Sequence, residues 1–271
     1  MSNRQKQGVI ARLLSLPNDN PTKTIMVALI LCLVCSVLVS TSAVVLKSRQ
    51  IANQQADIKK NILAVTGLLV EGGDIDALFD QFDIKMVDLN TGDYVDIDPT
   101  NYDQYKMAKD PSVSTELAAE FDIANIGRRA DVAPVYLLKQ GDTLDQVVLP
   151  LHGYGLWSTL YGFISFEADF NTIGGLQFYA HAETPGLGGE VDNPKWRAQW
   201  HGKKAFDENG KLEIKVIRGH VNYQLADAKY QVDGLSGATL TSRGVSNLVN
   251  FWLGDHGFGP YLQKMSSEME K

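Results

Sequence analysis

The sequence predicts an α+β protein, built from an antiparallel sheet with flanking helices, plus one N-terminal transmembrane helix. Three observations lead to this fold class. Residues 25–46 carry no charge, and a helix needs about 20 apolar residues to cross a bilayer. Short apolar segments separated by turns recur between residues 84 and 183, as in antiparallel sheets. Helical patterns close the chain, and strands followed by helices are typical of α+β folds.

The composition is that of a globular protein with enough apolar residues for a core. The chain has 271 residues, of which 44% are hydrophobic and 21% charged, and its net charge is −7. Binding of nucleic acid needs a clustered basic face, so no nucleic-acid partner is expected. The five histidines show no metal-site spacing, and zinc sites need clustered ligands, so no metal is assigned.

The apolar run at residues 25–46 is interpreted as an uncleaved membrane anchor that follows a tail of residues 1–24. A cleaved signal peptide has a shorter apolar core. Both flanks of the run are basic, so the positive-inside rule does not decide its orientation. Cys32 and Cys35 lie inside the run. We interpret them as small apolar residues, and a thiol pair facing a neighbouring protein is the alternative.

The soluble part, residues 47–271, is predicted element by element from its apolar periodicity. Residues 47–69 should continue the helix as far as the Glu-Gly-Gly-Asp sequence that follows. A second apolar run at 147–166 contains Pro150 and three glycines, so it is interpreted as paired strands and not as another span. Residues 100–130 carry no clear signal. The predicted strands occupy residues 84–98 (two short strands), 135–139, 146–153, 158–169, 176–183, 212–219 and 229–232.

Three helices are predicted after the first strands. Residues 194–206 would place Trp196 and Trp200 on one helix face. Residues 241–257 carry apolar side chains at the i, i+3, i+4 and i+7 spacing of a buried stripe, and residues 260–271 form the last helix. The residues of the stripe are Val245, Leu248, Val249 and Trp252.

A hydroxyl-rich segment, Asp-Gly-Leu-Ser-Gly-Ala-Thr-Leu-Thr-Ser at residues 233–242, precedes this stripe. Thr241 or Ser242 is expected to cap the helix. The first N–H groups of a helix lack partners and bind anions such as phosphate, and Gly234 and Gly237 allow close backbone approach. A phosphate site and a plain solvated cap both remain open on these grounds. A hydrolase elbow is disfavoured because the second glycine of Gly-x-Ser-x-Gly is missing.

The same segment resembles a known modification motif. Residues 233–239 read Asp-Gly-Leu-Ser-Gly-Ala-Thr, similar to the flavinylation motif Asp-Gly-x-Ser/Thr-Gly-Ala-Thr. The anchor, the segment at 149–163, the Glu-Thr-Pro-Gly-Leu-Gly-Gly-Glu loop at 183–190 and the Phe-Trp-Leu-Gly at 251–254 occur in the matching order. The whole chain thus resembles the C subunit of the sodium-translocating NADH:quinone reductase, and more distantly the G subunit of the RNF complex.

The resemblance implies a function and a location. In that family a flavin transferase joins FMN, through its phosphate, to the last threonine of the motif, which is Thr239 here. It implies an FMN-binding part at about residues 134–256, within a periplasmic domain of residues 47–271. Residues 1–24 would be a cytoplasmic tail at the bacterial inner membrane. The implied partners are the other members of a six-subunit complex, the transferase and membrane lipid.

Within such a complex the resemblance implies a relay of electrons. NADH is oxidised at another subunit, and electrons reach this FMN from an iron–sulfur centre. They continue to a second covalent FMN in the B subunit and finally to quinone, while sodium moves outward. Two alternatives remain: an RNF-type protein for ferredoxin-linked transport, and an anchored assembly module without a cofactor.

The expected cofactor contacts combine the resemblance with local composition. Asp233 is also explained as a turn residue, residues 183–189 as a glycine-rich turn, and Trp157 as a core side chain. Lys215 is expected near the electron-rich edge of the flavin. The candidate cofactor-binding residues are Thr239, Asp233, Ser236, Gly237, Ala238, Leu240, Thr241, Glu183, Thr184, Gly186, Leu187, Gly188, Trp157 and Lys215.

Overall fold

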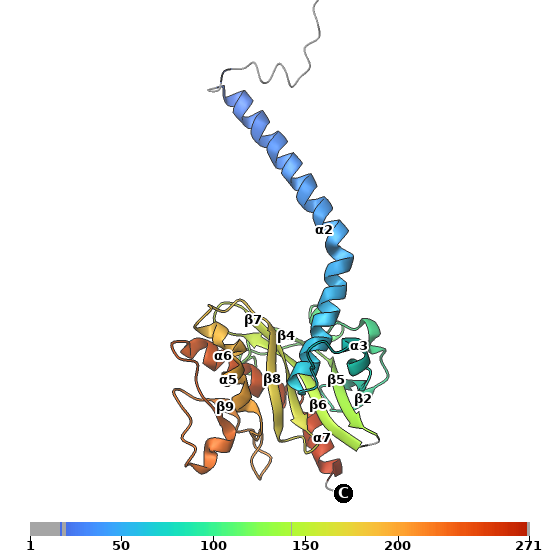
Figure 1. The fold of residues 1–271 in the computed structure, drawn as a ribbon, viewed down its shortest axis with the longest axis vertical. Coiled ribbons are helices and arrows are strands. Elements are labelled where there is room, and N and C mark those ends of the chain that lie inside the picture. The colour runs from blue at the N-terminus through green and yellow to red at the C-terminus, as the bar shows by residue number, and fades with distance from the viewer. Residues whose placement is uncertain (1–16, 18–19, 142, 270–271) are drawn as a thin grey trace, which may run out of the picture. The chain divides into compact units, whose positions relative to one another are not determined.

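The computed structural model describes residue 17 and residues 20–141 and 143–269. The chain divides into two compact units, Met1–Gln55 and Ala56–Lys271. The first unit holds the apolar part of the long helix, and the second holds the sheet and the remaining helices (Figure 1).

Helix α2, Pro21–Val65, contains the predicted anchor. Its most apolar window has a mean hydropathy of 2.7. Such length and composition suffice to cross a membrane. Asn20 caps the helix by accepting a hydrogen bond from the Thr22 amide at 2.9 Å.

The predicted end of this helix was wrong. We expected it to reach residue 69, but it ends at Val65 because the chain reverses at Gly67, which has a φ of 75°. The amide of Leu68 then donates back to the Leu63 carbonyl at 2.9 Å, which satisfies a carbonyl at the helix end. The Glu-Gly-Gly-Asp sequence therefore lies beyond the helix and does not terminate it.

Six strands form one antiparallel sheet in the order β2-β1-β5-β6-β7-β8, which confirms the predicted fold class (Figure 1). The run at 147–166 lies in β6 and β7, so the paired-strand interpretation is confirmed. The last strand begins at Ile173 and not at residue 176. The strands are β1 (Phe82–Asp88), β2 (Tyr94–Val95), β5 (Val132–Gln140), β6 (Thr143–Tyr154), β7 (Thr159–Glu167) and β8 (Ile173–Ala180).

Successive side chains along each strand point to opposite faces of the sheet, and both faces of this sheet carry apolar side chains. One face packs on α6, Thr239–Leu253, whose stripe of apolar side chains is buried as predicted. The other face packs on the end of α2, where Ile62 and Leu63 are fully buried against Val148 and Phe163. Helix α7, Gly259–Met269, joins the first face through Tyr261 and Leu262. The sheet therefore holds α6, and with it residue 239, on a rigid support.

The remaining elements are short. Residues 194–206 were predicted as one helix, but α5 (Pro194–Arg197) gives way to a 3₁₀ turn, Ala198–Trp200, and Gly202 turns the chain with a φ of 76°. Trp196 and Trp200 nevertheless pack together, with ring centroids 5.9 Å apart. The other short elements are α3 (Ile75–Phe79), η1 (Pro99–Asn101), α4 (Gln104–Met107), β3 (Ser114–Glu116), β4 (Arg128–Ala130), η2 (Gly188–Asp192), β9 (Lys215–Val216), η4 (Ala226–Tyr230) and β10 (Gln231–Val232).

One buried imidazole makes stability depend on pH. His152 on β6 is 7% exposed, and within the described residues its Nδ1 has no hydrogen-bond partner. The ring stacks on Tyr161 with centroids 5.8 Å apart and meets the edge of Tyr105 at 4.8 Å. Burial lowers the pKa of His152 to about 4, against a small opposing effect of Asp122. The folded chain therefore holds this imidazole neutral at neutral pH.

We expect the free energy of unfolding to fall as the pH drops from about 6.5 towards 4, by about 3 kcal/mol in all and by about 2 kcal/mol at pH 5.0, from His152 alone. The unfolded chain binds the proton in this range, whereas the folded chain does not. Urea unfolding of the full chain in detergent at pH 7.5 and 5.0 measures this difference. His152→Gln should reduce the difference, while His201→Gln, an exposed control, should leave it unchanged. An equal difference in wild type and His152→Gln would contradict the assignment.

Candidate functional site

The start of α6 presents one exposed hydroxyl. The helix begins at Thr239, after Ala238, and no side chain caps it. The predicted cap at Thr241 or Ser242 was wrong, because both side chains lie in the first turn and are buried. Ser242 Oγ accepts a hydrogen bond from the Leu235 amide at 2.9 Å, which ties the preceding loop to the helix. Thr239 itself is exposed.

Glu183 joins three segments beneath this helix start. It is 5% exposed. Its Oε2 accepts a hydrogen bond from Thr241 Oγ1 at 2.6 Å. Its Oε1 accepts from the amides of Leu156, Trp157 and Ser158 at 3.0, 2.9 and 3.2 Å. Both carboxylate oxygens therefore point into the protein and are occupied by protein donors.

Two glycines make room for this carboxylate. A Cβ on Gly188 would lie 2.5 Å from Thr241 Oγ1 and 2.7 Å from Glu183 Oε2. A Cβ on Gly155 would lie 2.7 Å from Glu183 Oε1. All three distances are shorter than real contacts allow, so any larger residue would push the carboxylate out of its place. The glycines of the 183–189 loop thus serve the internal network as well as the surface.

The hydrogen bonds around Glu183 decide its charge. Burial by itself raises the pKa of a carboxyl, but the bonds from Thr241 and from the three amides outweigh it and lower the pKa of Glu183. Because the pKa of Glu183 is lower in the folded chain than in the unfolded chain, its ionised carboxylate stabilises the fold at pH values above the unfolded pKa. This stabilisation is lost as the pH falls through the folded pKa. Glu183 is therefore an anion at neutral pH.

Asp233 shapes the loop that leads to the helix. Its Oδ1 accepts from the Val221 amide at 2.7 Å, and its Oδ2 lies 2.9 Å from His220 Nδ1. Its carbonyl accepts from Trp196 Nε1 at 2.7 Å. A Cβ on Gly234 would lie 2.4 Å from the Ile217 carbonyl oxygen, so this position requires glycine. The start of the motif is thus packed into the fold.

Large apolar side chains are exposed on the segments around Thr239. Trp157 is 66% exposed, Leu187 44% and Leu240 46%. The Trp157 amide is held by Glu183. A Cβ on Gly237, whose φ is 72°, would lie 3.0 Å from Leu187 Cδ2. Exposed apolar groups on linked loops are typical of a ligand surface, and a flat apolar ring with a phosphate tail fits them and the helix start.

The other candidate residues divide between surface and interior. Thr184, Gly186 and Ser236 are exposed, whereas Ala238 is buried. Lys215 is exposed on β9, next to Val216, whose amide donates to Ser246 Oγ on α6. At 1.5 Å per residue, Ser246 lies about 10 Å along the helix from its start. The structure therefore brings the 155–158, 183–189 and 236–241 segments together and leaves Lys215 farther along α6.

Comparisons with known proteins agree with this arrangement. Residues 155–254 match the FMN-binding domain family, and this range contains every segment just described. The chain is 50% identical over 252 residues to the C subunit of the Na(+)-translocating NADH-quinone reductase of Pseudomonas aeruginosa, with 91% of this chain and 97% of that one covered. The chain belongs to the C-subunit family of these reductases. The Vibrio vulnificus member is also 50% identical, with 92% of this chain and 96% of that one covered.

Solved structures of this C-subunit family share the fold. The crystal structure of Shewanella oneidensis NqrC matches with a TM-score of 0.73 and 33% identity, and it covers 80% of this chain and 99% of that one. The Parabacteroides distasonis member matches with a TM-score of 0.62 and 29% identity, with 80% and 96% covered. The predicted resemblance is thus confirmed, and the relatives named here carry the quinone-reductase name and not that of the RNF complex.

Proposed function

We propose that this chain is the membrane-anchored FMN carrier of a Na⁺-translocating NADH-quinone reductase and relays electrons between its other subunits. The observation that carries the proposal is the exposed Thr239 at the first residue of α6, beside exposed apolar side chains. The FMN-binding domain match over residues 155–254 and the names of the relatives support it.

Thr239 is the proposed point of covalent attachment, as a phosphoester made by a flavin transferase. Its side chain is accessible in the folded protein. The amides of the first turn of α6 and the positive end of the helix dipole stabilise a phosphate diester there. Gly237, in its left-handed conformation, lets the backbone approach this charge without a side chain in the way.

Exposed side chains around Thr239 would contact the flavin ring, and the hydrogen bonds of Glu183 keep the segments that carry these side chains in place. Bound FMN supplies the electron-carrying chemistry, as flavins do. Trp157, Leu187 and Leu240 offer the apolar surface that orients a ring and excludes water. Exposed Thr184 and Ser236 offer polar contacts at its edge, and Lys215 offers a more distant positive charge. Glu183 acts as a positioning residue for these walls because its oxygens face inward.

Intact-mass spectrometry of the chain from the purified complex tests covalent attachment. The proposal predicts a mass higher by one FMN less one water, since a phosphoester forms with loss of water. The mass of the bare sequence in an active complex would contradict it. The same result would favour the alternative of an anchored assembly module without a cofactor.

We propose that residues 25–46 anchor the chain in the bacterial inner membrane, with residues 47–271 in the periplasm and residues 1–24 in the cytoplasm. The apolar window of α2 supports the anchor, and the side follows from the family resemblance. Protease added to spheroplasts should remove the epitope of an antibody against residues 47–271, while a cytoplasmic marker protein stays intact. Protection of that epitope until the membrane is permeabilised would reverse the orientation.

A further inference from the structure

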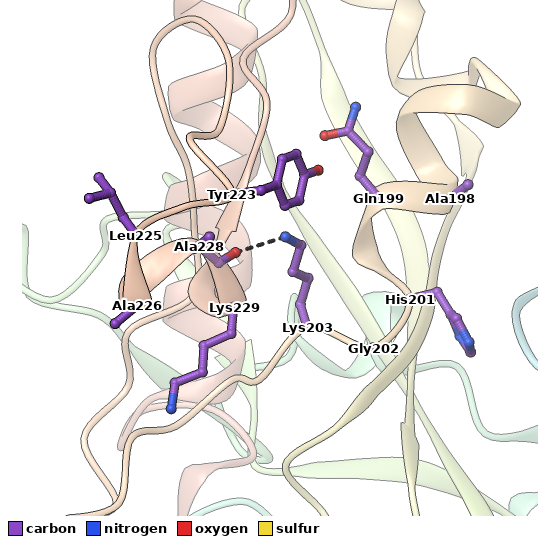
Figure 2. A pocket seen from close by; sticks show the side chains of 10 residues that line it. All are labelled: Ala198, Gln199, His201, Gly202, Lys203, Tyr223, Leu225, Ala226, Ala228 and Lys229. Atoms are coloured by element: carbon purple, nitrogen blue, oxygen red, sulfur yellow. Dashed lines mark hydrogen bonds between the residues drawn. The ribbon is translucent and has the colours of Figure 1, made fainter.

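A positively charged hollow lies beside the first residue of the motif, because the Asp233 amide donates to Oε1 of its lining residue Gln199 at 3.1 Å. It has a volume of about 490 Å³ and is formed by the 198–203 segment and the 223–229 loop (Figure 2). Among the described residues that line it, none is acidic. The other lining residues that the argument uses are Lys203, Tyr223, Leu225, Ala228 and Lys229. On a chain of net charge −7, such a hollow is a local reversal of charge.

Lys203 is the buried cation of this hollow. The residue is 7% exposed, and its Nζ donates a hydrogen bond to the Ala228 carbonyl at 2.8 Å. The same ammonium lies 4.9 Å from the ring centroid of Tyr223, and Figure 2 shows it extending towards both groups. An ammonium has three donors, and in the described part of the chain Lys203 makes no ion pair within 4.0 Å.

The nearby carboxylates are engaged elsewhere. Burial lowers the pKa of Lys203, and the charge of Asp233 opposes this only in part. Asp233 itself accepts from Val221 and contacts His220. Asp227, in the loop that forms the hollow, accepts from Gln231 Nε2 at 2.6 Å. A buried cation without a direct counter-ion is costly, and a carboxylate at the mouth of the hollow would remove much of that cost.

The rim of the hollow is apolar and exposed. Tyr223 is 66% exposed and Leu225 55%, and residues 222–227 are exposed throughout. An exposed tyrosine and leucine around a desolvated charge are the composition of a protein-binding hot spot. A free inorganic anion would make no use of these two side chains.

We propose that this hollow is a docking site for an acidic segment of a neighbouring subunit, with a carboxylate on Lys203 and an apolar side chain on Tyr223 and Leu225. The cationic lining favours an acidic occupant, and the chain's membership in a family of reductase subunits favours a neighbouring subunit as its source. The docking proposal requires that the chain assembles with other subunits, but it does not require that FMN is attached. The intact-mass measurement of the flavin adduct therefore tests the proposed cofactor attachment separately from docking.

Hydroxyl-radical footprinting of the purified complex and of the isolated full-length chain, in the same detergent, tests the docking site. We expect the modification rates of Tyr223 and Leu225 to be at least about fivefold lower in the complex. Tyr94, which is 45% exposed on β2, is the reference tyrosine. Equal rates for Tyr223 and Leu225 in both samples would overturn the proposal.

Zero-length carbodiimide cross-linking identifies the chemistry of the occupant. The reagent joins an amine to a carboxylate as an amide, while the carbodiimide takes up the water as a urea. We expect peptides that join Lys203 or the exposed Lys229 to an Asp or Glu of another subunit. Protection of Tyr223 in the isolated chain by added sodium phosphate, without protection in the complex, would show a free-anion site and overturn the proposal.

Matched variants separate docking from folding. Tyr223→Ala changes an exposed side chain and Lys203→Met removes the charge, and each should raise the fraction of chain lost from the complex at high salt about tenfold. Lys203→Arg keeps the charge and should restore retention. Lys195→Met, at an exposed lysine outside the hollow, should behave as wild type. Normal retention of both Tyr223→Ala and Lys203→Met would overturn the proposal.

Discussion

A Thr239→Ala chain should give a dark band under ultraviolet light after denaturing electrophoresis, where the wild-type chain gives a fluorescent one. Thr239 begins α6 and exposes its side chain, whereas Thr241 two residues later is buried on Glu183. Only the first of these hydroxyls is accessible to a transferase in the folded protein. Because a phosphoester survives denaturation and a non-covalently bound flavin does not, the loss should be complete.

Two matched variants make the Thr239 result specific. Thr184→Ala removes an exposed threonine of the facing loop, and its band should stay fluorescent. Thr239→Ser keeps a hydroxyl at the same place and should retain fluorescence. A fluorescent Thr239→Ala band would move the attachment to another residue, and peptide mass mapping would then identify it.

Glu183→Ala is expected to lower the free energy of unfolding by about 3–5 kcal/mol, since it leaves three backbone amides and a buried hydroxyl without their acceptor. The three amides belong to residues 156–158, and the hydroxyl belongs to Thr241. The 155–158 loop should therefore separate from the start of α6. Urea unfolding of the full chain in detergent, followed by tryptophan fluorescence, measures the loss.

The control for Glu183 is Glu208→Ala, at an exposed carboxylate, which should change the free energy by less than about 0.5 kcal/mol. Glu183→Gln keeps the shape and one acceptor oxygen, so it should lose less stability than the alanine variant. The Gln variant should also attach flavin when folded, because Glu183 is proposed to position the walls and not to contact the ring. A loss below about 1 kcal/mol in Glu183→Ala would remove the positioning role.

Local patterns were sufficient for most of the fold. The uncharged run predicted the long apolar helix, because a continuous apolar stretch of this length has few alternatives. Alternating segments predicted the strands of the sheet, and the i, i+3, i+4, i+7 stripe predicted α6 and its buried face. Each of these signals depends on residues that are close in sequence.

Element ends and short elements needed more than local patterns. Trp196 and Trp200 fit a helical spacing, yet the segment between Pro194 and Gly202 is divided between an α and a 3₁₀ turn. Its tryptophans pack on each other and on distant parts of the core. The strands predicted at 212–219 and 229–232 shrink to the two-residue strands β9 and β10, which pair in parallel outside the main sheet.

The candidate site likewise has features that local sequence predicts and features that depend on distant residues. The motif residues 233–239 and the glycine-rich loop are visible in the order of the amino acids, because the modification and the turns each need particular residue types. The inward role of Thr241 and Glu183 is not visible there, since 58 residues separate them in the chain. An isolated Glu before a glycine-rich turn looks like any surface carboxylate.

The amino-acid order alone determined the long apolar helix, the strand-forming segments, the stripe of α6 and the candidate attachment residue. Folding in three dimensions decided where α6 starts, which hydroxyl stays outside, and which carboxylate holds the three segments of the site together. The physical reason is that hydrogen bonds and burial between distant segments outweigh local propensities of about a few tenths of a kcal/mol. The helix can therefore begin at Thr239 without a cap, because Ser242 and Thr241 are bonded to Leu235 and Glu183 instead.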